Sequence, residues 1–280
     1  NFRLKIQTNG TILNHEIISF FKEYKINPGI SIDGSQDVHD FQRKNFQGSK
    51  TFEAIMNNIK ILNSQGIHAA ALMVLTRKSL NSNLEWLKNF ALIDLPLKIN
   101  PLYSAGEALK HQELFLKTGD YADYIIRVFE YVLKNEIDIS ISPIEEILHA
   151  VLNKTTPRGC VYSSKCLESF ICVNQDGKIF PCGRFADENI NFLGDIFNGI
   201  NNDGKKILEI LKLSRNSGLN KKCRECKYKI LCNGGCLRMQ GAMCEDHKKF
   251  LDWLYSEGLK KYAAYLNKRR KEILCLMNSY

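Results

Sequence analysis

The chain lacks any run of about 20 successive apolar residues, which a membrane-spanning helix would need. Its first residues, NFRLKIQTNG, have neither the apolar core nor the cleavage site of a signal peptide. The first 159 residues contain no cysteine, although the whole chain has ten. These absences argue against a membrane protein and against a secreted, disulfide-bonded one. They predict a cytoplasmic chain whose cysteines are reduced.

The composition is that of a folded protein, with 44% hydrophobic and 25% charged residues among 280. This length accommodates one domain of ordinary size and a smaller one. The net charge is +9, and basic residues crowd the segment 260–271. Nucleic-acid binding is one meaning of such a run. The sequence favours the other meaning, the solvated face of a final helix whose apolar side carries Tyr262, Tyr265 and Leu266.

Strand and helix patterns alternate through the first half of the chain. We expect strands at 2–7, 29–33, 69–76, 97–102 and 137–141, and helices at 14–24, 51–64, 81–91, 120–134 and from 143. A strand and a helix about every 30 residues predict βαβ units and a parallel sheet, buried on both faces. The alternation ends at 155–159 (TTPRG), where we expect a domain boundary.

Small polar side chains collect where the expected strands end. They include Gln7, Asn9, Ser31 and Asp33. Ligands of parallel α/β sheets bind at the carboxyl ends of the strands, but turn chemistry alone also favours such residues there. Arg43, in HDFQR, is an isolated cation that either holds a carboxylate bidentately or simply faces solvent. Both interpretations stay open from these residues.

Cysteines are concentrated in the second half of the chain. Five of them fall within the 22 residues 223–244: Cys223, Cys226, Cys232, Cys236 and Cys244. Two thiolates separated by two residues can bind one metal centre at ~2.3 Å without strain. Five sulfurs exceed the four of one tetrahedral site, so we expect a second centre. The upstream Cys160, Cys166 and Cys182 bring the total to eight, or two sets of four.

Between these groups, the apolar runs 170–173 and 178–180 flank the turn sequence NQDG, which predicts a hairpin. Cys172 lies in its first strand, where a small buried side chain is the favoured role. Judged by spacing alone, two four-cysteine sites suit structural zinc, in a module whose basic tail contacts nucleic acid or an acidic partner. Colour distinguishes the two kinds of site, because iron–sulfur clusters would make the protein brown whereas zinc would leave it colourless.

The motifs resemble those of a known enzyme family. QTNG at 7–10, SIDG at 31–34 and NPLYSAGEA at 100–108 are similar to the middle strands of a radical S-adenosylmethionine barrel. Cys166, Gly177 and Cys182 resemble the SPASM extension, as do the later cysteines, which are separated by two, five and three intervening residues. The resemblance implies an α/β fold with a partial (β/α)6 radical SAM barrel at 1–155, a small cysteine-rich SPASM domain at 156–250 and a basic helix at 251–280.

Similarity to the sulfatase-maturating and ribosomal-peptide-modifying members implies two auxiliary [4Fe–4S] clusters. It assigns to them a first set of ligands, Cys160, Cys166, Cys182 and Cys236, and a second set, Cys223, Cys226, Cys232 and Cys244. It also implies contacts to S-adenosylmethionine from Gln7, Asn9, Ser31 and Asp33 to polar groups, from Arg43 to the carboxylate, and from Leu102 to the adenine.

The resemblance implies a maturase that takes a hydrogen from a peptide or protein substrate through a 5′-deoxyadenosyl radical. The product would be a cross-link, an epimer or another modification. An electron donor such as flavodoxin or ferredoxin would serve it. Anaerobic sulfatase maturation, which forms formylglycine, is the alternative within the family.

Two departures from the family pattern bear on this expectation. The three-cysteine loop that binds the third cluster is absent, so we expect this chain to be the C-terminal part of a longer protein that cannot cleave S-adenosylmethionine alone. Gly183 stands where sulfatase-maturating members carry an aspartate base. The lack of this aspartate favours cross-linking or epimerisation over formylglycine formation, and it leaves the catalytic residue unassigned.

Overall fold

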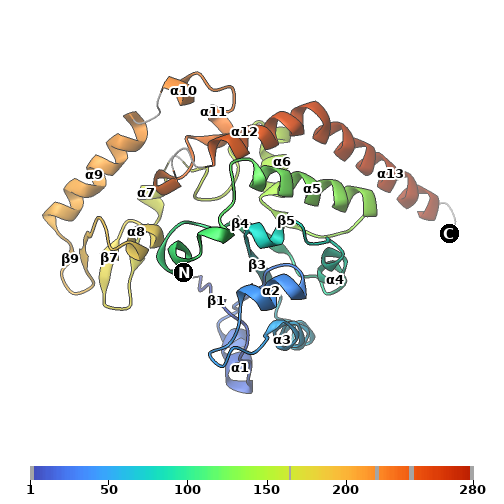
Figure 1. The fold of residues 1–280 in the computed structure, drawn as a ribbon, viewed down its shortest axis with the longest axis horizontal. Helices are drawn as coiled ribbons and strands as arrows, with labels where there is room; N and C mark the ends of the chain where they lie inside the picture. The colour runs from blue at the N-terminus through green and yellow to red at the C-terminus, as the bar shows by residue number, and fades with distance from the viewer. Residues whose placement is uncertain (1–2, 164, 218–220, 240–242, 278–280) are drawn as a thin grey trace. The chain divides into compact units, whose positions relative to one another are not determined.

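The computed structural model describes residues 3–163, 165–217, 221–239 and 243–277 (Figure 1). The chain forms two compact units. The first unit comprises Asn1–Leu102, Leu114–Glu145 and Asp252–Tyr280, and the second comprises Tyr103–Glu113 and Glu146–Leu251. The C-terminal helix thus belongs to the first unit, and the chain enters the second unit about ten residues before the segment 155–159 where a boundary was expected.

The first unit is built on a parallel sheet. Its strands, in sheet order, are β1 (Gln7–Thr8), β2 (Gly29–Ser31), β3 (Ala70–Leu75), β4 (Leu97–Pro101) and β5 (Ile141–Ser142). All four pairings are parallel, which confirms the α/β prediction. The two outer strands are much shorter than expected, because each has a hydrogen-bonded neighbour on one side only within this sheet.

Helices follow the strands of this unit. They are α1 (His15–Glu23), α2 (Gln36–Gln42), α3 (Phe52–Ser64), α4 (Trp86–Leu92) and α5 (Asp120–Asn135), with a 3₁₀ turn η1 (Arg77–Ser79). Asn14 starts α1 as expected, since its Oδ1 accepts from the Ile17 N–H at 2.9 Å. Helix α2 lies between the expected strand at 29–33 and the expected helix at 51–64, where no element was predicted. Helix α4 begins five residues later than expected, because Thr76 and Ser79 cap η1 first.

The core of the first unit alternates along its strands. In β3, Ala71, Met73 and Leu75 are fully buried, whereas Ala70 and Leu72 are half-buried. The expectation of a sheet buried on both faces is therefore wrong for this strand. The fully buried face is the one that carries the apolar packing of the unit.

The C-terminal helix α13 (Leu259–Met277) pairs three of its basic residues with carboxylates of its own unit. Lys261 pairs with Glu130 of α5, Lys268 with Glu136, and Arg269 with Asp138 at 3.2 Å between Nη2 and Oδ2. On the apolar side, Tyr262 and Trp253 lie beside Phe129, with ring centroids 6.1 Å and 5.7 Å away. These contacts explain the basic run as the outer face of a packed helix.

The second unit contains a small antiparallel sheet in the order β6-β7-β8-β9. Its strands are β6 (Cys172–Val173), β7 (Lys178–Phe180), β8 (Gly194–Asp195) and β9 (Gly199–Ile200). The expected hairpin is confirmed, with Cys172 opposite Phe180 and the Gly177 N–H donating to the Asn174 carbonyl at 2.9 Å. Strands β8 and β9 carry only two residues each and gave no sequence signal.

Short helices make up the rest of the second unit and its borders. They are η2 (Gly106–Lys110), η3 (Gln112–Leu114), α6 (Ile144–Asn153), α7 (Cys166–Ser169), α8 (Gly183–Asp187), α9 (Asn202–Ser217), α10 (Lys221–Arg224), α11 (Lys229–Cys232), η4 (Leu237–Met239) and α12 (Cys244–Trp253), which the π-helical turn η5 (Leu254–Gly258) joins to α13. Within the described residues, none of the helices is both long enough and apolar enough to cross a bilayer.

Candidate functional site

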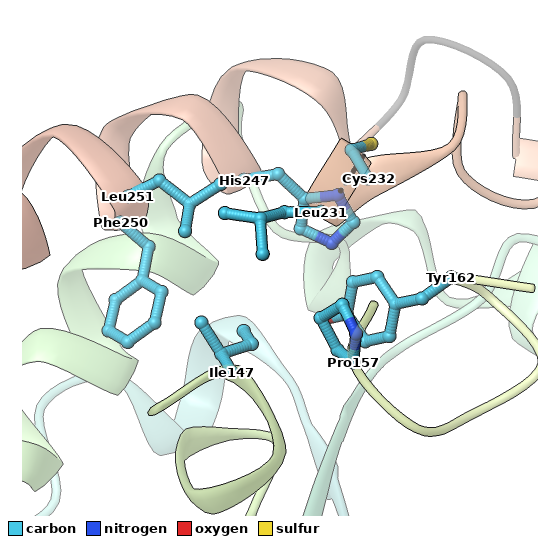
Figure 2. Close-up of a pocket in the computed structure, with 8 residues that line it drawn as sticks. All are labelled: Ile147, Pro157, Tyr162, Leu231, Cys232, His247, Phe250 and Leu251. Carbon is cyan, nitrogen blue, oxygen red and sulfur yellow. Dashed lines mark hydrogen bonds between the residues drawn. The ribbon is translucent and has the colours of Figure 1, made fainter. Parts of the chain in front are cut away.

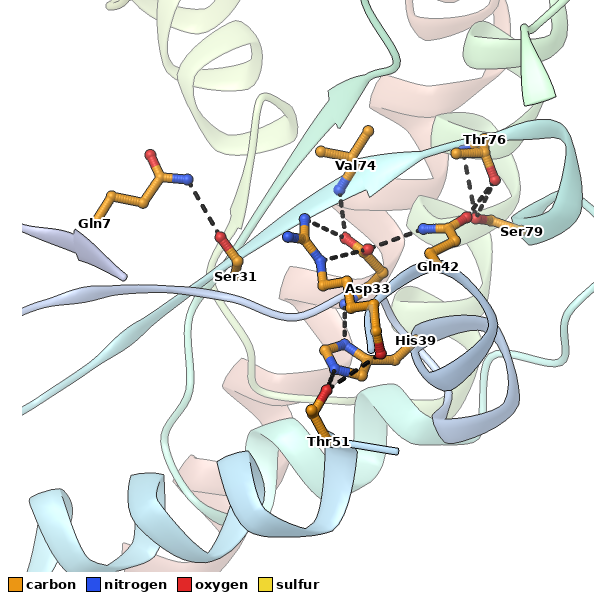
Figure 3. A network of polar contacts seen from close by, with 10 residues as sticks. Gln7, Ser31, Asp33, His39, Gln42, Thr51, Val74, Thr76 and Ser79 are labelled. Atoms are coloured by element: carbon orange, nitrogen blue, oxygen red, sulfur yellow. Dashed lines mark hydrogen bonds and ion pairs between the residues drawn. The ribbon is translucent and has the colours of Figure 1, made fainter. Parts of the chain in front are cut away.

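Asp33 lies at the centre of a polar network at the end of β2 (Figure 3). Its Oδ2 accepts from Arg43 Nε at 2.7 Å and from Gln42 Nε2 at 2.9 Å. Its Oδ1 accepts from Arg43 Nη2 at 3.2 Å and from the Val74 N–H at 2.8 Å. Asp33 is 1% exposed, so its charge is matched inside the protein rather than by water.

Arg43 is held along one edge of its guanidinium. Nε and Nη2 grip Asp33, while Nη1 has no partner among the described residues. The side chain is 30% exposed, against 2% for that of Asp33. One edge of a fixed, positively charged fork therefore remains free to bind an anionic group such as a carboxylate.

Gln42 is a site residue that sequence reasoning missed. Its amide nitrogen donates to Asp33, and its Oε1 accepts from the Thr76 hydroxyl at the end of β3. It therefore ties the ends of two neighbouring strands together. The available signal was its place beside Arg43 in HDFQR, in a segment that was expected to be a loop.

His39 holds the same loop through contacts of both ring nitrogens. Its Nδ1 accepts from the Asp33 N–H at 3.2 Å, and its Nε2 lies 3.0 Å from Thr51 Oγ1. Thr51 in turn donates to the Arg43 carbonyl at 3.2 Å. Burial lowers the pKa of His39, and the Arg43 charge lowers it further, against the opposing charges of Asp33 and Asp40. The structure thus favours a neutral ring with its proton on Nε2.

The other predicted S-adenosylmethionine contacts lie apart from this network or at its edge. Gln7 Nε2 donates to Ser31 Oγ at 3.4 Å, and this links the ends of β1 and β2. Asn9 is exposed and accepts from its own turn at Thr11. Leu102 is half-buried, and its N–H extends the ladder to the Leu75 carbonyl at 2.9 Å.

In the second unit, the pKa values of Cys232 and Cys244 respond to the charges of other cysteines of the second set. Burial raises the pKa of Cys232, the Gly234 backbone opposes this, and the charges of Cys244, Cys223 and Cys226 raise it further. Burial also raises the pKa of Cys244, which is coupled to Cys223 and Cys226 as well. The raised pKa values favour protonated thiols at Cys232 and Cys244, and each would become a ligand only by releasing its proton to a metal centre.

Mostly apolar side chains line a pocket beside Cys232 of this set (Figure 2). His247 of α12 points its Nδ1 toward Cys232 Sγ at 3.7 Å, and its ring lies 5.5 Å from that of Tyr162 between centroids. The remaining lining residues are Ile147, Pro157, Leu231, Phe250 and Leu251. Burial lowers the pKa of His247, so a neutral imidazole faces the sulfur. Cys232 is the member of the second set that lines this pocket.

The cysteines of the first set lie in separate segments of the second unit. Cys182 caps α8 and packs on a small cluster around Phe180 and Phe185, Cys166 begins α7, and Cys160 is exposed. Within the described residues, no three His, Cys, Asp or Glu side chains converge as ligands of one metal ion do. A four-iron cube spreads its four sulfur ligands over a larger volume than a single ion. An all-sulfur donor set of reduced cysteines suits such a cluster.

A second polar network lies beside the first set. Arg184 Nη1 donates to Cys236 Sγ at 3.4 Å, and its guanidinium lies 4.8 Å from the Tyr103 ring centroid. The Tyr103 hydroxyl donates to Glu188 Oε1 at 2.9 Å, and Glu188 is ion-paired with Arg238. The sequence analysis did not single out Arg184, Glu188 or Arg238.

No family model matches the chain. Among curated proteins, the cysteine-type anaerobic sulfatase-maturating enzyme of Clostridium novyi is 27% identical over 279 residues, covering 90% of this chain and 71% of its own length. The serine-type enzyme of Bacteroides thetaiotaomicron is 24% identical over 298 residues, covering 96% of this chain and 70% of its own length. The chain is a relative of the anaerobic sulfatase-maturating enzymes.

Solved structures of such enzymes share the fold. The enzyme anSMEcpe with bound AdoMet has a TM-score of 0.76 at 21% identity, covering 94% of this chain and 75% of that one. Streptococcus suis SuiB bound to the precursor peptide SuiA has a TM-score of 0.61 at 15% identity, covering 84% and 55%. At these identities the likeness establishes the fold, and the radical S-adenosylmethionine enzyme expected from the sequence is confirmed by relatives and fold together.

The expected reaction needs a correction. The absence of an aspartate at Gly183 favoured cross-linking or epimerisation, but the curated relatives named above mature sulfatases. One residue next to a cysteine thus carried less information than similarity along nine-tenths of the chain. The relatives support a radical S-adenosylmethionine maturase, and the sulfatase branch is the better fit.

Proposed function

We propose that this chain belongs to a maturase that oxidises a cysteine or serine of a sulfatase through a 5′-deoxyadenosyl radical. The observation that carries the proposal is the similarity to both cysteine-type and serine-type sulfatase-maturating enzymes over about nine-tenths of the chain or more. The polar rim of the parallel sheet and the reduced cysteines of the second unit support it from the structure.

In this proposal, Arg43 binds the carboxylate of S-adenosylmethionine with its free guanidinium edge. Asp33 does not contact the ligand, since both of its oxygens already accept hydrogen bonds, and it fixes the direction of Arg43 instead. Gln7 and Ser31 line the rim beside it, with Asn9 and Leu102 as further contacts. A flavodoxin- or ferredoxin-like donor supplies electrons, and the protein acts in the cytoplasm.

The two sets of cysteines hold two auxiliary [4Fe–4S] clusters in this proposal. When bound, such clusters supply one-electron redox chemistry. The protein provides eight sulfurs, surrounds Cys232 with apolar side chains and places Arg184 beside Cys236.

Gly183 leaves the proton acceptor of this chain at a different position from that of its sulfatase-maturating relatives. An added Cβ at Gly183 would meet nothing within 4 Å, so the structure has room for a side chain there. Gly183→Asp therefore tests the reaction directly, because it adds a carboxylate beside Cys182 without a steric cost.

The test is anaerobic expression of the natural gene with a sulfatase, followed by mass spectrometry of the sulfatase's reactive cysteine or serine. We expect conversion to formylglycine, a higher yield with Gly183→Asp, and at least about a tenfold loss with Arg43→Met, because a bidentate carboxylate contact is removed. Lys44→Met, an exposed neighbour, is the control.

Unmodified sulfatase in every case, together with a changed mass in a peptide encoded beside the gene, would reject sulfatase maturation in favour of another peptide modification. Equal yields from Arg43→Met and Lys44→Met would reject the role of Arg43.

A further inference from the structure

Two arginines occupy equivalent places after two cysteines of the first set. Arg184 follows Cys182 by two residues, in CGR, and Arg238 follows Cys236 by two residues, in CLR. Both side chains are half-buried in the second unit. Their partners differ, and this difference distinguishes their roles.

Arg238 has its charge neutralised within the protein. It forms an ion pair with Glu188, and its guanidinium lies 5.5 Å from the Phe185 ring centroid. The Arg238 charge lowers the pKa of Glu188, and a hydrogen bond from Tyr103 lowers it as well, so the pair is ionised. Arg238 therefore adds no net charge near the cysteines.

Arg184 keeps its charge. Among the described residues it has no carboxylate partner, and its contacts are the Cys236 sulfur at 3.4 Å and the face of Tyr103 at 4.8 Å. The Tyr103 ring is fixed in turn by the hydrogen bond from its hydroxyl to Glu188 at 2.9 Å. The Glu188–Arg238 pair thus positions Tyr103, and Tyr103 positions Arg184.

We propose that Arg184 sets the reduction potential of the auxiliary cluster held by the first set, by donating a charged hydrogen bond to the Cys236 sulfur. Reduction adds one negative charge to the cluster and its sulfurs. A nearby cation and a hydrogen bond to a ligand sulfur both stabilise that added charge, so they raise the potential. The inference rests on the proposed function only in its assignment of Cys236 as a cluster ligand.

The test measures the potential directly. The protein is reconstituted anaerobically with iron and sulfide in a Cys226→Ala/Cys232→Ala background, so that only the cluster of the first set remains. Its midpoint potential is then obtained by electron paramagnetic resonance during a redox titration. The variants are Arg184→Met, which removes the charge and the donor, and Arg184→Lys, which keeps the charge but loses the planar donor.

We expect Arg184→Met to shift the reduction equilibrium about tenfold toward the oxidised cluster, which is ~59 mV more negative for one electron. Arg184→Lys should shift it less. Tyr103→Leu should shift it in the same direction, because it frees Arg184 from its place. The control is Lys206→Met, which removes one positive charge from the exposed side of α9 and should leave the potential unchanged.

A potential unchanged in Arg184→Met with full iron content would overturn the inference, as would equal shifts in Arg184→Met and Lys206→Met. Loss of iron from Arg184→Met, Arg184→Lys and Tyr103→Leu alike would also overturn it, because it would show a purely structural role. Iron content of Cys236→Ala in the same background tests the ligand assignment separately. Undiminished iron there would reject the proposed ligands, whatever the potentials show.

Discussion

At the scale of single residues, His39 shows how a buried ring can fix a loop. One ring nitrogen accepts a hydrogen bond from a backbone N–H and the other faces the Thr51 hydroxyl, which in turn donates a hydrogen bond to the Arg43 carbonyl. A second proton on the ring would face the Asp33 N–H, a donor. The neutral ring is therefore part of the structure that holds Arg43.

The lowered pKa of His39 predicts a loss of stability in acid. Above its ordinary pKa of 6.5 the ring is neutral in the folded and unfolded states, and it contributes no pH dependence. Below 6.5 the unfolded chain takes up a proton that the folded chain does not, so the free energy of unfolding falls until the pH reaches the lowered folded pKa.

We expect His39→Asn to be less sensitive to acid than the natural protein. In urea denaturation, the difference in unfolding free energy between the natural protein and His39→Asn should decrease from about pH 7.5 to about pH 5.5. His247 contributes equally to both proteins and cancels. The exposed His68→Asn is the control, and a gap that is constant with pH would contradict the prediction.

At the scale of elements, the small sheet of the second unit depends on a close backbone approach at β8. Gly194 has φ of +146°, and a Cβ there would lie 2.0 Å from the Gly199 carbonyl oxygen of β9. No other residue type fits without moving β9 away. Two-residue strands have few hydrogen bonds with which to compensate.

Gly194→Ala should therefore cost about 1–3 kcal/mol in stability, the usual range for overpacking. The measurement is chemical denaturation followed by circular dichroism. Gly183→Ala is the matched control, since its Cβ meets nothing and alanine suits a helix better than glycine. Equal midpoints for the two variants would show that β8 and β9 separate without penalty.

At the scale of the whole molecule, the protein combines a unit that carries the polar rim with a cysteine-rich one. The first unit has no cysteine among its described side chains and carries the polar rim. Every cysteine whose side chain is described lies in the second unit.

The metal content follows from this organisation. We expect the anaerobically prepared protein to be brown, and we expect Cys226→Ala/Cys232→Ala to lose about four irons of about eight. Cys172→Ala, which changes a strand cysteine outside both sets, should keep all of them. Elemental analysis makes the measurement. Stoichiometric zinc with negligible iron would instead support the structural zinc module.

Local patterns were sufficient for the elements with strong periodicity. The positions of α1, α3, β3 and the β6–β7 hairpin followed from apolar spacing, the Asn14 cap and the NQDG turn, because these signals act between residues close in sequence. The grouping of the cysteines into two sets of four stays a prediction. Weak segments such as α2, β8 and β9 were missed, because tertiary contacts rather than local preference form them.

The amino-acid sequence by itself thus determined the α/β alternation, the resemblance to radical S-adenosylmethionine enzymes and the residues available as ligands. Only the tertiary structure decided which of them act on one another. Asp33 meets the Val74 N–H across 41 residues, Arg184 meets Cys236 across 52, and Tyr103 meets Glu188 across 85. Such contacts arise when strands pair and helices pack, and patterns of neighbouring residues do not predict which distant residues will meet.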